Sequence, residues 1–223
     1  MKTVLSTKKL TPSQKNLILG AGFSVVEYDA IKIEPLDFEL PEALENLIFT
    51  SKNGVEAFLK KSHKKSLLLE ERAEVRCFCV GTKTEALLIK NSFSMIKTAQ
   101  NASELGDFIL KNHKKEHFTF FCSAIRRDEL PEKLTENQVS FEEIIAYETR
   151  LNTKAFNRQF DAILFFSPSG VQSFTSANTL ENTLAVCIGQ TTANEVQKYT
   201  EHFTIANATT VESVIARTVK ALI

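Results

Sequence analysis

Two stretches of this chain repeat one pattern, and the repeat limits the folds that the chain can adopt. Residues 47–58 read LIFTSKNGVEAF, and residues 163–174 read ILFFSPSGVQSF. In both, an apolar run ends at a serine, a Gly-Val pair follows, and a phenylalanine comes one helical turn later. A second pair, 79–84 and 187–192, follows in the same order. Ordered pairs of this kind indicate an internal duplication, so we expect two similar halves.

Each repeated unit has the pattern of a buried strand followed by an amphipathic helix. The strands are apolar on both faces, as in a parallel sheet that helices cover. Apolar side chains then recur at helical spacing, as at Val55, Phe58 and Leu59. Alternating strands and helices predict two similar α/β domains, each a parallel sheet flanked by helices, with right-handed crossovers.

The number of strands in each half predicts how the chain is threaded. Strand-like runs lie near 46–50, 75–80, 95–98 and 117–122 in the first half, and near 161–167, 184–189 and 202–206 in the second. The second half lacks one unit, and residues 3–19 supply a strand and a helix that fill this place. We therefore expect the chain to begin in one domain, build the other and return.

This threading predicts a discontinuous first domain, residues 1–24 and 151–223, and a second domain, residues 36–138. The two crossings, 25–35 and 139–150, have strand-like composition and are expected to form an antiparallel two-stranded link. Because such a link is narrow, we expect hinge motion and a ligand site in a cleft between the domains.

Composition argues against several functional classes. Lys and Arg number 27, as do Asp and Glu, so the basic excess of a typical nucleic-acid binder is absent. No apolar run approaches the roughly 20 residues that span a membrane, and no signal peptide is recognisable, so we expect a cytoplasmic protein. The four cysteines lie in apolar runs without zinc-ligand spacing, which predicts buried thiols. Nucleotide-loop, zinc-protease and serine-hydrolase motifs are also absent from the sequence.

The strand-to-helix turns carry the candidate binding residues. Ligands of parallel α/β sheets bind beyond the carboxyl ends of the strands, where hydroxyls and helix N-termini hold anions without net charge. The candidates in these turns are Thr50, Ser51, Lys52, Asn53, Gly81, Thr82, Thr84, Ser167, Ser169, Gly189, Thr191 and Thr192. The alternative is that these serines and threonines only cap helices, which is their commonest role there.

Tyr147 is the candidate catalytic residue, since it ends the return crossing and is expected near the cleft. A tyrosine hydroxyl can donate a proton or a hydrogen bond to a leaving hydroxyl. The alternative is a half-buried strand residue that packs at the junction of the domains.

Taken together, these motifs resemble uroporphyrinogen-III synthases. The residues that carry the resemblance are 49–58, 80–84, 127–130, 146–149, 166–171 and 188–193, in the family's order. The resemblance implies a cyclising lyase of haem and tetrapyrrole biosynthesis that uses no cofactor or metal. Its substrate is hydroxymethylbilane, a linear tetrapyrrole rich in carboxylates. The family removes the terminal hydroxyl as water and closes the ring with ring D inverted.

The resemblance also implies roles for single residues. Tyr147 matches the tyrosine proposed to assist loss of the hydroxyl, Thr192 matches a threonine in the facing turn, and Lys8 and Arg127 become substrate-binding candidates. Two positions depart from the family. Lys8 stands where an arginine is usual, which removes the bidentate fork, and the turn 122–127 lacks the usual glycine.

The expected partner is thus the linear tetrapyrrole, with no nucleic acid, no membrane and a monomeric state. A second hypothesis remains open, in which a two-domain hinge protein binds a small polyanion without catalysis. A third is a degenerate paralogue that keeps the fold alone.

Overall fold

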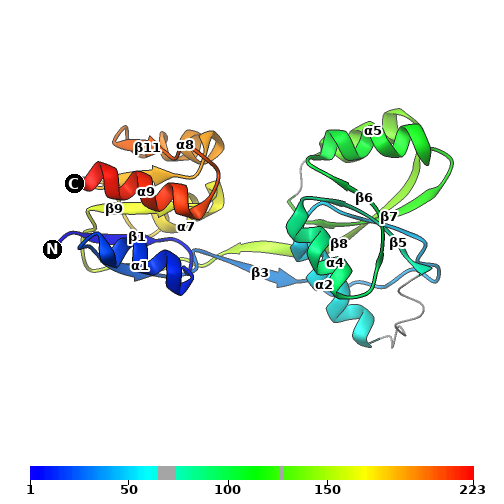
Figure 1. Ribbon diagram of the computed structural model, residues 1–223, viewed down its shortest axis with the longest axis horizontal. Helices are drawn as coiled ribbons and strands as arrows, with labels where there is room; N and C mark the ends of the chain where they lie inside the picture. Colours follow the sequence, from blue (N-terminus) through cyan, green and yellow to red (C-terminus); the bar gives the residue numbers. More distant parts are fainter. Residues whose placement is uncertain (65–73, 126–127) are drawn as a thin grey trace. The chain divides into compact units, whose positions relative to one another are not determined.

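The computed structural model describes residues 1–64, 74–125 and 128–223 (Figure 1). The chain divides into two compact units. Unit 1 consists of Met1–Lys32 and Arg150–Ile223, and unit 2 consists of Ile33–Thr149. The chain therefore starts in unit 1, forms all of unit 2 and returns to complete unit 1.

In the described ranges, unit 1 is built on a five-stranded sheet in which every neighbouring pair is parallel. The strand order is β11-β10-β9-β1-β2. The bounds are β1 Thr3–Ser6, β2 Ser24–Glu27, β9 Ala162–Phe165, β10 Leu184–Cys187 and β11 Phe203–Ile205. Every residue of β1, β9 and β10 is buried, because helices cover both faces of the sheet.

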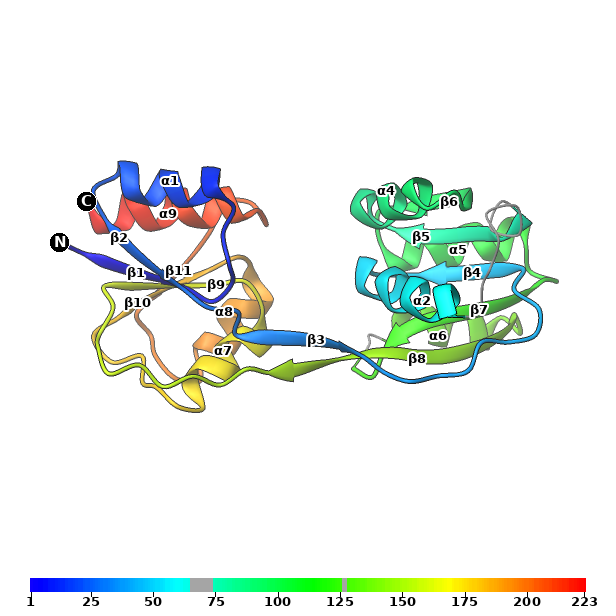
Figure 2. The ribbon, with the colours of Figure 1, turned by 90° about the horizontal axis from the view of Figure 1, so that it is seen from below.

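Four helices cover the unit 1 sheet in the described part of the chain, two on each face (Figure 2). Their bounds are α1 Pro12–Gly20, α7 Pro168–Thr175, α8 Gln190–Val196 and α9 Val211–Leu222. On one face, α1 and α9 contribute Ile18 and Val214 to the core. On the other, α7 and α8 contribute Phe174 and Val196.

Unit 2 contains, among described residues, a six-stranded sheet in the order β3-β8-β7-β4-β5-β6. The bounds are β3 Ile31–Pro35, β4 Asn46–Phe49, β5 Arg76–Val80, β6 Ser94–Ala99, β7 His117–Ser123 and β8 Ser140–Leu151. Strands β4 to β8 pair in parallel, whereas β3 runs opposite to β8 (Figure 2). Fully buried phenylalanines dominate the core, with Phe49 and Phe121 stacked on one face of the sheet and Phe120 packed on the other.

The helices of unit 2 also lie on both faces of their sheet. Their bounds are α2 Lys52–Lys64, α4 Thr82–Lys90, α5 Ala102–Asn112 and α6 Glu129–Glu136. Helices α2 and α4 bury Phe58 and Leu88 on one face, and α5 and α6 bury Ile109 and Leu134 on the other. The predicted fold class, parallel sheets flanked by helices in two similar α/β domains, is confirmed.

The two sheets have equivalent strand orders, but the chain begins at a different strand of each order. If β11, β10 and β9 are matched to β6, β5 and β4, then β1 takes the place of β7 and β2 takes the place of β8. The unit missing from the second half is therefore supplied by the N-terminus, as the strand count predicted.

The predicted linker strands need two corrections. Residues 24–27 pair with β1 as an edge strand of unit 1, so only β3 remains from the first crossing. Strand β8 is more than a link, since it pairs with β7 from His117↔Ser140 to Ser123↔Tyr147. Without these two segments, the N–H and C=O groups along one side of β1 and of β7 would have no strand partner. Strand β2 supplies the partners for β1, and β8 supplies them for β7.

Candidate active site

A cavity of about 330 Å³ opens at the carboxyl end of the unit 2 sheet. It brings together the ends of four strands and the beginnings of helices α5 and α6, which lie far apart in the sequence. Its polar lining residues are Thr50, Ser51, Gln100, Asn101, Ser123, Glu129 and Tyr147. Val80, Phe120 and Leu130 supply an apolar wall. The cavity is thus apolar on one side and rich in hydrogen-bonding groups elsewhere, most of them neutral, with Glu129 adding a carboxylate.

Tyr147 reaches this cavity through an irregularity in strand pairing. The register between β7 and β8 shifts after Cys122, so that Tyr147 lies opposite Ser123, the last residue of β7. Such a bulge re-aims the side chains that follow it. The residue is only 7% exposed, yet its hydroxyl has no hydrogen-bond partner among the described residues. The phenol is therefore held by its surroundings while its hydroxyl remains available to a bound molecule.

The hydroxyls beside Tyr147 fall into two groups. Ser51 Oγ accepts a hydrogen bond from the Asn53 N–H at 3.2 Å, and Ser123 Oγ accepts one from the Ile125 N–H at 3.3 Å. Both serines thus stabilise their own turns. Thr50 Oγ1 forms no such bond with any residue that the structure describes, which leaves it free for a ligand.

The turn after β5 offers a different kind of donor. Gly81 is the N-cap of α4 at φ +84°, a conformation that favours glycine, and no described side chain caps this helix. The first N–H groups of α4 are consequently without a side-chain acceptor. Thr82 is exposed and Thr84 is buried.

Several unit 2 candidates stand outside the cavity. Gly81, Thr82, Thr84, Lys52 and Asn53 are not among its lining residues. Lys52 instead pairs with Glu56 at 3.1 Å, one helical turn along α2. Arg127, the remaining candidate of this unit, lies outside the described residues.

In unit 1 the candidate turns follow β1, β9 and β10, which are neighbours and therefore end at one edge of the sheet. Ser167 caps α7, since its Oγ accepts from the Gly170 N–H at 3.1 Å. This bond supports the capping interpretation for Ser167. Ser169 is half-buried, and its hydroxyl has no partner in the described ranges.

Gly189, after β10, is the unit 1 counterpart of Gly81. It begins α8 in an extended conformation, and no described side chain caps the helix. Thr191 is exposed, whereas Thr192 is 1% exposed and packs into the sheet side of α8. The two units therefore share a glycine at an uncapped helix start and a buried threonine in the first turn.

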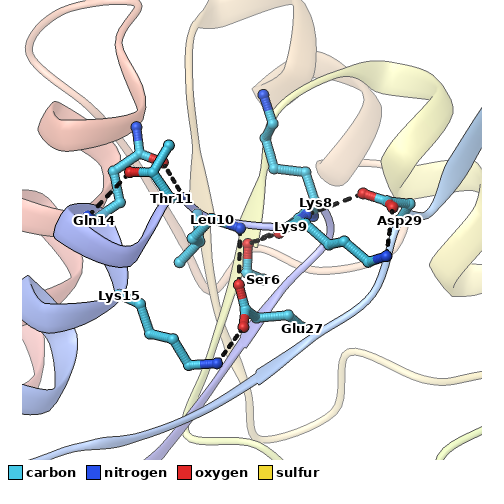
Figure 3. Close-up of polar contacts among 9 residues, drawn as sticks. All are labelled: Ser6, Lys8, Lys9, Leu10, Thr11, Gln14, Lys15, Glu27 and Asp29. Atoms are coloured by element: carbon cyan, nitrogen blue, oxygen red, sulfur yellow. Dashed lines mark hydrogen bonds and ion pairs between the residues drawn. The ribbon is translucent and has the colours of Figure 1, made fainter.

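Lys8 lies in the turn between β1 and α1 (Figure 3). Its backbone is fixed by Ser6, whose Oγ donates to the Lys8 carbonyl at 2.5 Å. Its side chain extends away from the neighbouring contacts, with Nζ 5.8 Å from the centre of the Phe166 ring (Figure 3). No ion pair holds this ammonium in the described part of the chain, so it is available to an anion.

Glu27, the last residue of β2, holds the same turn in place through a hydrogen bond and an ion pair. The Leu10 N–H donates to Glu27 Oε1 at 2.7 Å, and Lys15 Nζ lies 2.6 Å from Glu27 Oε2 (Figure 3). Burial raises the pKa of Glu27, but the bonds from Lys15 and Leu10 outweigh it and hold the pKa below its ordinary value. Glu27 is thus an ionised clamp on the turn that carries Lys8.

The sequence patterns missed part of the cavity lining. Ser123 ends β7, and Gln100 and Asn101 follow β6, so all three stand at carboxyl ends of strands. The rule that selected the other turns applies to them equally. Glu129 begins α6, a helix that none of the repeated pairs includes.

The remaining side chains give little indication of a metal centre or a membrane segment. All four cysteines are free and buried, as predicted. Within the described ranges, no three His, Cys, Asp or Glu side chains are grouped to hold a metal ion. Among the described helices, none combines the length and apolar character required to cross a bilayer.

Comparisons with known proteins agree on one family. A family model described as uroporphyrinogen-III synthase HemD matches residues 14–216. The porphyrin biosynthesis protein HemD of Ruminiclostridium josui is 27% identical, over 87% of this chain and 43% of that protein. This chain therefore spans less than half the length of that relative.

Two solved structures share the fold. The uroporphyrinogen-III synthetase of Helicobacter pylori 26695 aligns with a TM-score of 0.77 and 20% identity, covering 99% of this chain and 100% of that one. A mutant uroporphyrinogen III synthase of the extremely thermophilic bacterium Thermus thermophilus aligns with a TM-score of 0.64 and 14% identity, covering 100% and 99%. Since the family model spans most of the sequence, this chain belongs to the uroporphyrinogen-III synthase family.

Proposed function

We propose that this chain is a uroporphyrinogen-III synthase, which cyclises hydroxymethylbilane to uroporphyrinogen III with loss of water and inversion of ring D. Membership of the family supports the reaction. The observation that carries the proposal is the Tyr147 hydroxyl, which lines a cavity of about 330 Å³ and has no partner among the described residues.

The first step breaks the C–O bond of the hydroxymethyl group. Its electron pair leaves with the oxygen, the attached pyrrole supplies electrons to the carbon, and the Tyr147 hydroxyl donates to the departing oxygen, which leaves as water. The apolar wall of Val80, Phe120 and Leu130 suits the pyrrole ring. Thr50 and Ser51 lie beside the tyrosine in the same lining and can orient the hydroxymethyl group.

Substrate orientation is the second task, because the substrate is itself reactive and closes to the uninverted isomer without guidance. The uncapped starts of α4 and α8, at Gly81 and Gly189, are suited to receive substrate carboxylates. The other proposed contacts come from hydroxyls, amides and cations, namely Lys8, Lys52, Asn53, Thr82, Arg127, Ser167, Ser169 and Thr191. Thr84 and Thr192 are buried, so their proposed part is to position the turns that carry these contacts. Many weak contacts of this kind predict a modest loss from any single serine substitution.

The proposal includes three further expectations. The reaction needs no added cofactor or metal, the protein is a cytoplasmic monomer, and it does not bind nucleic acid. Equal numbers of basic and acidic residues support the last of these. Light scattering after gel filtration, with and without substrate, tests the monomeric state.

The deciding experiment generates hydroxymethylbilane in place and adds the purified protein without metal or cofactor. The products are oxidised, and the isomers are separated by chromatography. A dominant type III isomer is expected. Type I isomer alone, from a protein shown to be folded, would overturn the proposal and favour a two-domain hinge protein that binds a polyanion without catalysis.

A further inference from the structure

A second cavity, of about 350 Å³, lies in unit 1. Its walls come from residues just before β9 and β10 and from the end of α7. The candidate turns of unit 1 follow these strands, so the cavity lies at the opposite, amino edge of the same sheet. The proposed reaction makes no use of this edge.

One wall of this cavity is aromatic. Phe156 packs edge-on against Phe160, with 5.4 Å between ring centres, and nearly parallel to Phe174 at 6.3 Å. All three rings line the cavity, together with Ile163. A wall of this composition suits a flat apolar ring, since aromatic rings favour stacked and edge-on contacts.

Hydrogen bonds hold the walls in place without a ligand. Asn178 Oδ1 accepts from the Phe156 N–H at 2.9 Å, and its Nδ2 donates to the carbonyls of Lys154 and Phe174 at 2.8 and 2.9 Å. Thr183 Oγ1 donates to the Phe160 carbonyl at 3.0 Å. The segment before β9 is therefore fixed to the end of α7, and the cavity is preorganised for a ligand.

Two opposite charges line the cavity without neutralising each other. The Arg158 guanidinium lies 5.4 Å from the centre of the Phe160 ring and donates to Thr3 Oγ1 at 2.9 Å. This orientation leaves further N–H donors for a carboxylate. Neither Arg158 nor Glu181 forms an ion pair in the described part of the chain, although both line this cavity.

We propose that this cavity binds an aromatic α-amino acid. The ring of the ligand lies against the half-buried Phe156, which the buried Phe160 and Phe174 support, its carboxylate bonds to Arg158, and its ammonium faces Glu181. An apolar wall with one cation and one anion matches this class of ligand in every group. The site is independent of the proposed synthase activity, because it stands on the other edge of the sheet.

The test is a titration of the full chain with L-phenylalanine, followed by the backbone amide signals in NMR. Saturable shifts are expected at Phe156, Arg158 and Asn178. Phenethylamine lacks the carboxylate and 3-phenylpropionate lacks the ammonium, so each is expected to bind about tenfold more weakly. Equal binding of all three compounds would overturn the role of the two charges.

Variants localise the site. Arg158→Gln is expected to weaken L-phenylalanine binding about tenfold, as the loss of a charge-assisted bond implies. Ala177 is exposed and lines the cavity, so Ala177→Trp is expected to abolish binding without disturbing the core. Ala86→Trp, at an exposed position of α4, is the matched control. Unchanged binding in Ala177→Trp, or no shifts in the folded wild-type chain, would overturn the proposal.

Discussion

Units 1 and 2 have equivalent strand orders, yet their equivalent tyrosines differ in whether the side chain reaches an open cavity. Tyr28 follows β2 and packs on the face covered by α7 and α8, and Tyr147 in β8 packs on the equivalent face under α2 and α4. Tyr147 lines an open cavity, whereas Tyr28 lies edge-on to Phe156 at 5.2 Å, and its hydroxyl is sealed without a partner among the described residues.

The difference traces to strand pairing and to the neighbouring rings. The β1–β2 pairing is regular from Thr3↔Ser24 to Ser6↔Glu27, whereas β8 contains the bulge that brings Tyr147 opposite Ser123. Burial raises the pKa of Tyr28 to about 12. Duplication therefore supplies two similar scaffolds, and local register and packing decide which of them exposes a reactive group.

The largest expected effect separates the two tyrosines. Tyr147→Phe should lower turnover about 100-fold, since it removes a proton or hydrogen-bond donor from the reacting group. Tyr28→Phe should leave turnover unchanged and stabilise the fold by up to about 1 kcal/mol, because it removes a buried hydroxyl without a partner. The isomer assay and denaturant unfolding measure the two effects. Full activity in Tyr147→Phe would remove the tyrosine from the mechanism.

The second comparison concerns the glycines that begin α4 and α8. Gly81→Ala should destabilise unit 2 by about 2 kcal/mol, because φ +84° with ψ 141° suits glycine almost exclusively. Gly189 has an extended backbone, and a Cβ there would lie at an ordinary 3.5 Å from Thr209 Cγ2. Gly189→Ala should therefore be nearly neutral for folding. Amide hydrogen exchange, measured separately for the amides of unit 1 and of unit 2, distinguishes the two variants. Equal destabilisation by Gly81→Ala and Gly189→Ala would contradict this account.

The third comparison uses the glycines of the repeated Gly-Val pair. A Cβ at Gly54 would lie 3.0 Å from the Phe121 carbonyl oxygen, a backbone atom, whereas at Gly170 the nearest atom is Ser167 Oγ at 3.3 Å. Overpacking should make Gly54→Ala destabilising by about 1 kcal/mol despite the better helix propensity of alanine. Gly170→Ala should change stability less, since side chains yield more easily than backbone. The hydrogen-exchange rates of the backbone amides in β7 measure the destabilisation caused by Gly54→Ala.

The smallest expected effect concerns the Glu27 clamp of unit 1. Its pKa is lower in the folded protein than in the unfolded chain, so its stabilisation is present above the ordinary carboxyl pKa and is lost as pH falls through the folded value. Glu27→Gln should therefore cost only about 0.5 kcal/mol at neutral pH, because solvent screens this ion pair, and the difference from wild type should vanish in acid. Denaturant unfolding at neutral pH and in acid measures it. A difference that persists in acid would show that the charge is not the cause.

Much of the fold could be predicted because the relevant signals are local. The apolar runs at 46–50 and 161–167 became β4 and β9, and the helical stripe at Val55 and Phe58 is buried as the spacing required. The edge strand β2 was assigned to a linker because strand composition does not identify the partner of a strand. Of the candidate residues, Thr50, Ser51 and Tyr147 lie in one cavity, while Ser123, Gln100 and Asn101 were overlooked.

The sequence by itself determined the duplication, the alternation of strands and helices, the threading of the chain and the buried face of some helices, such as α2. These follow from periodicity and order along the chain, which neighbouring residues encode. The tertiary structure alone decided that Tyr147 and Thr50 line one cavity and that Tyr28 does not. The accessibility of a hydroxyl depends on packing and register between segments distant in the sequence, and no local pattern carries that information.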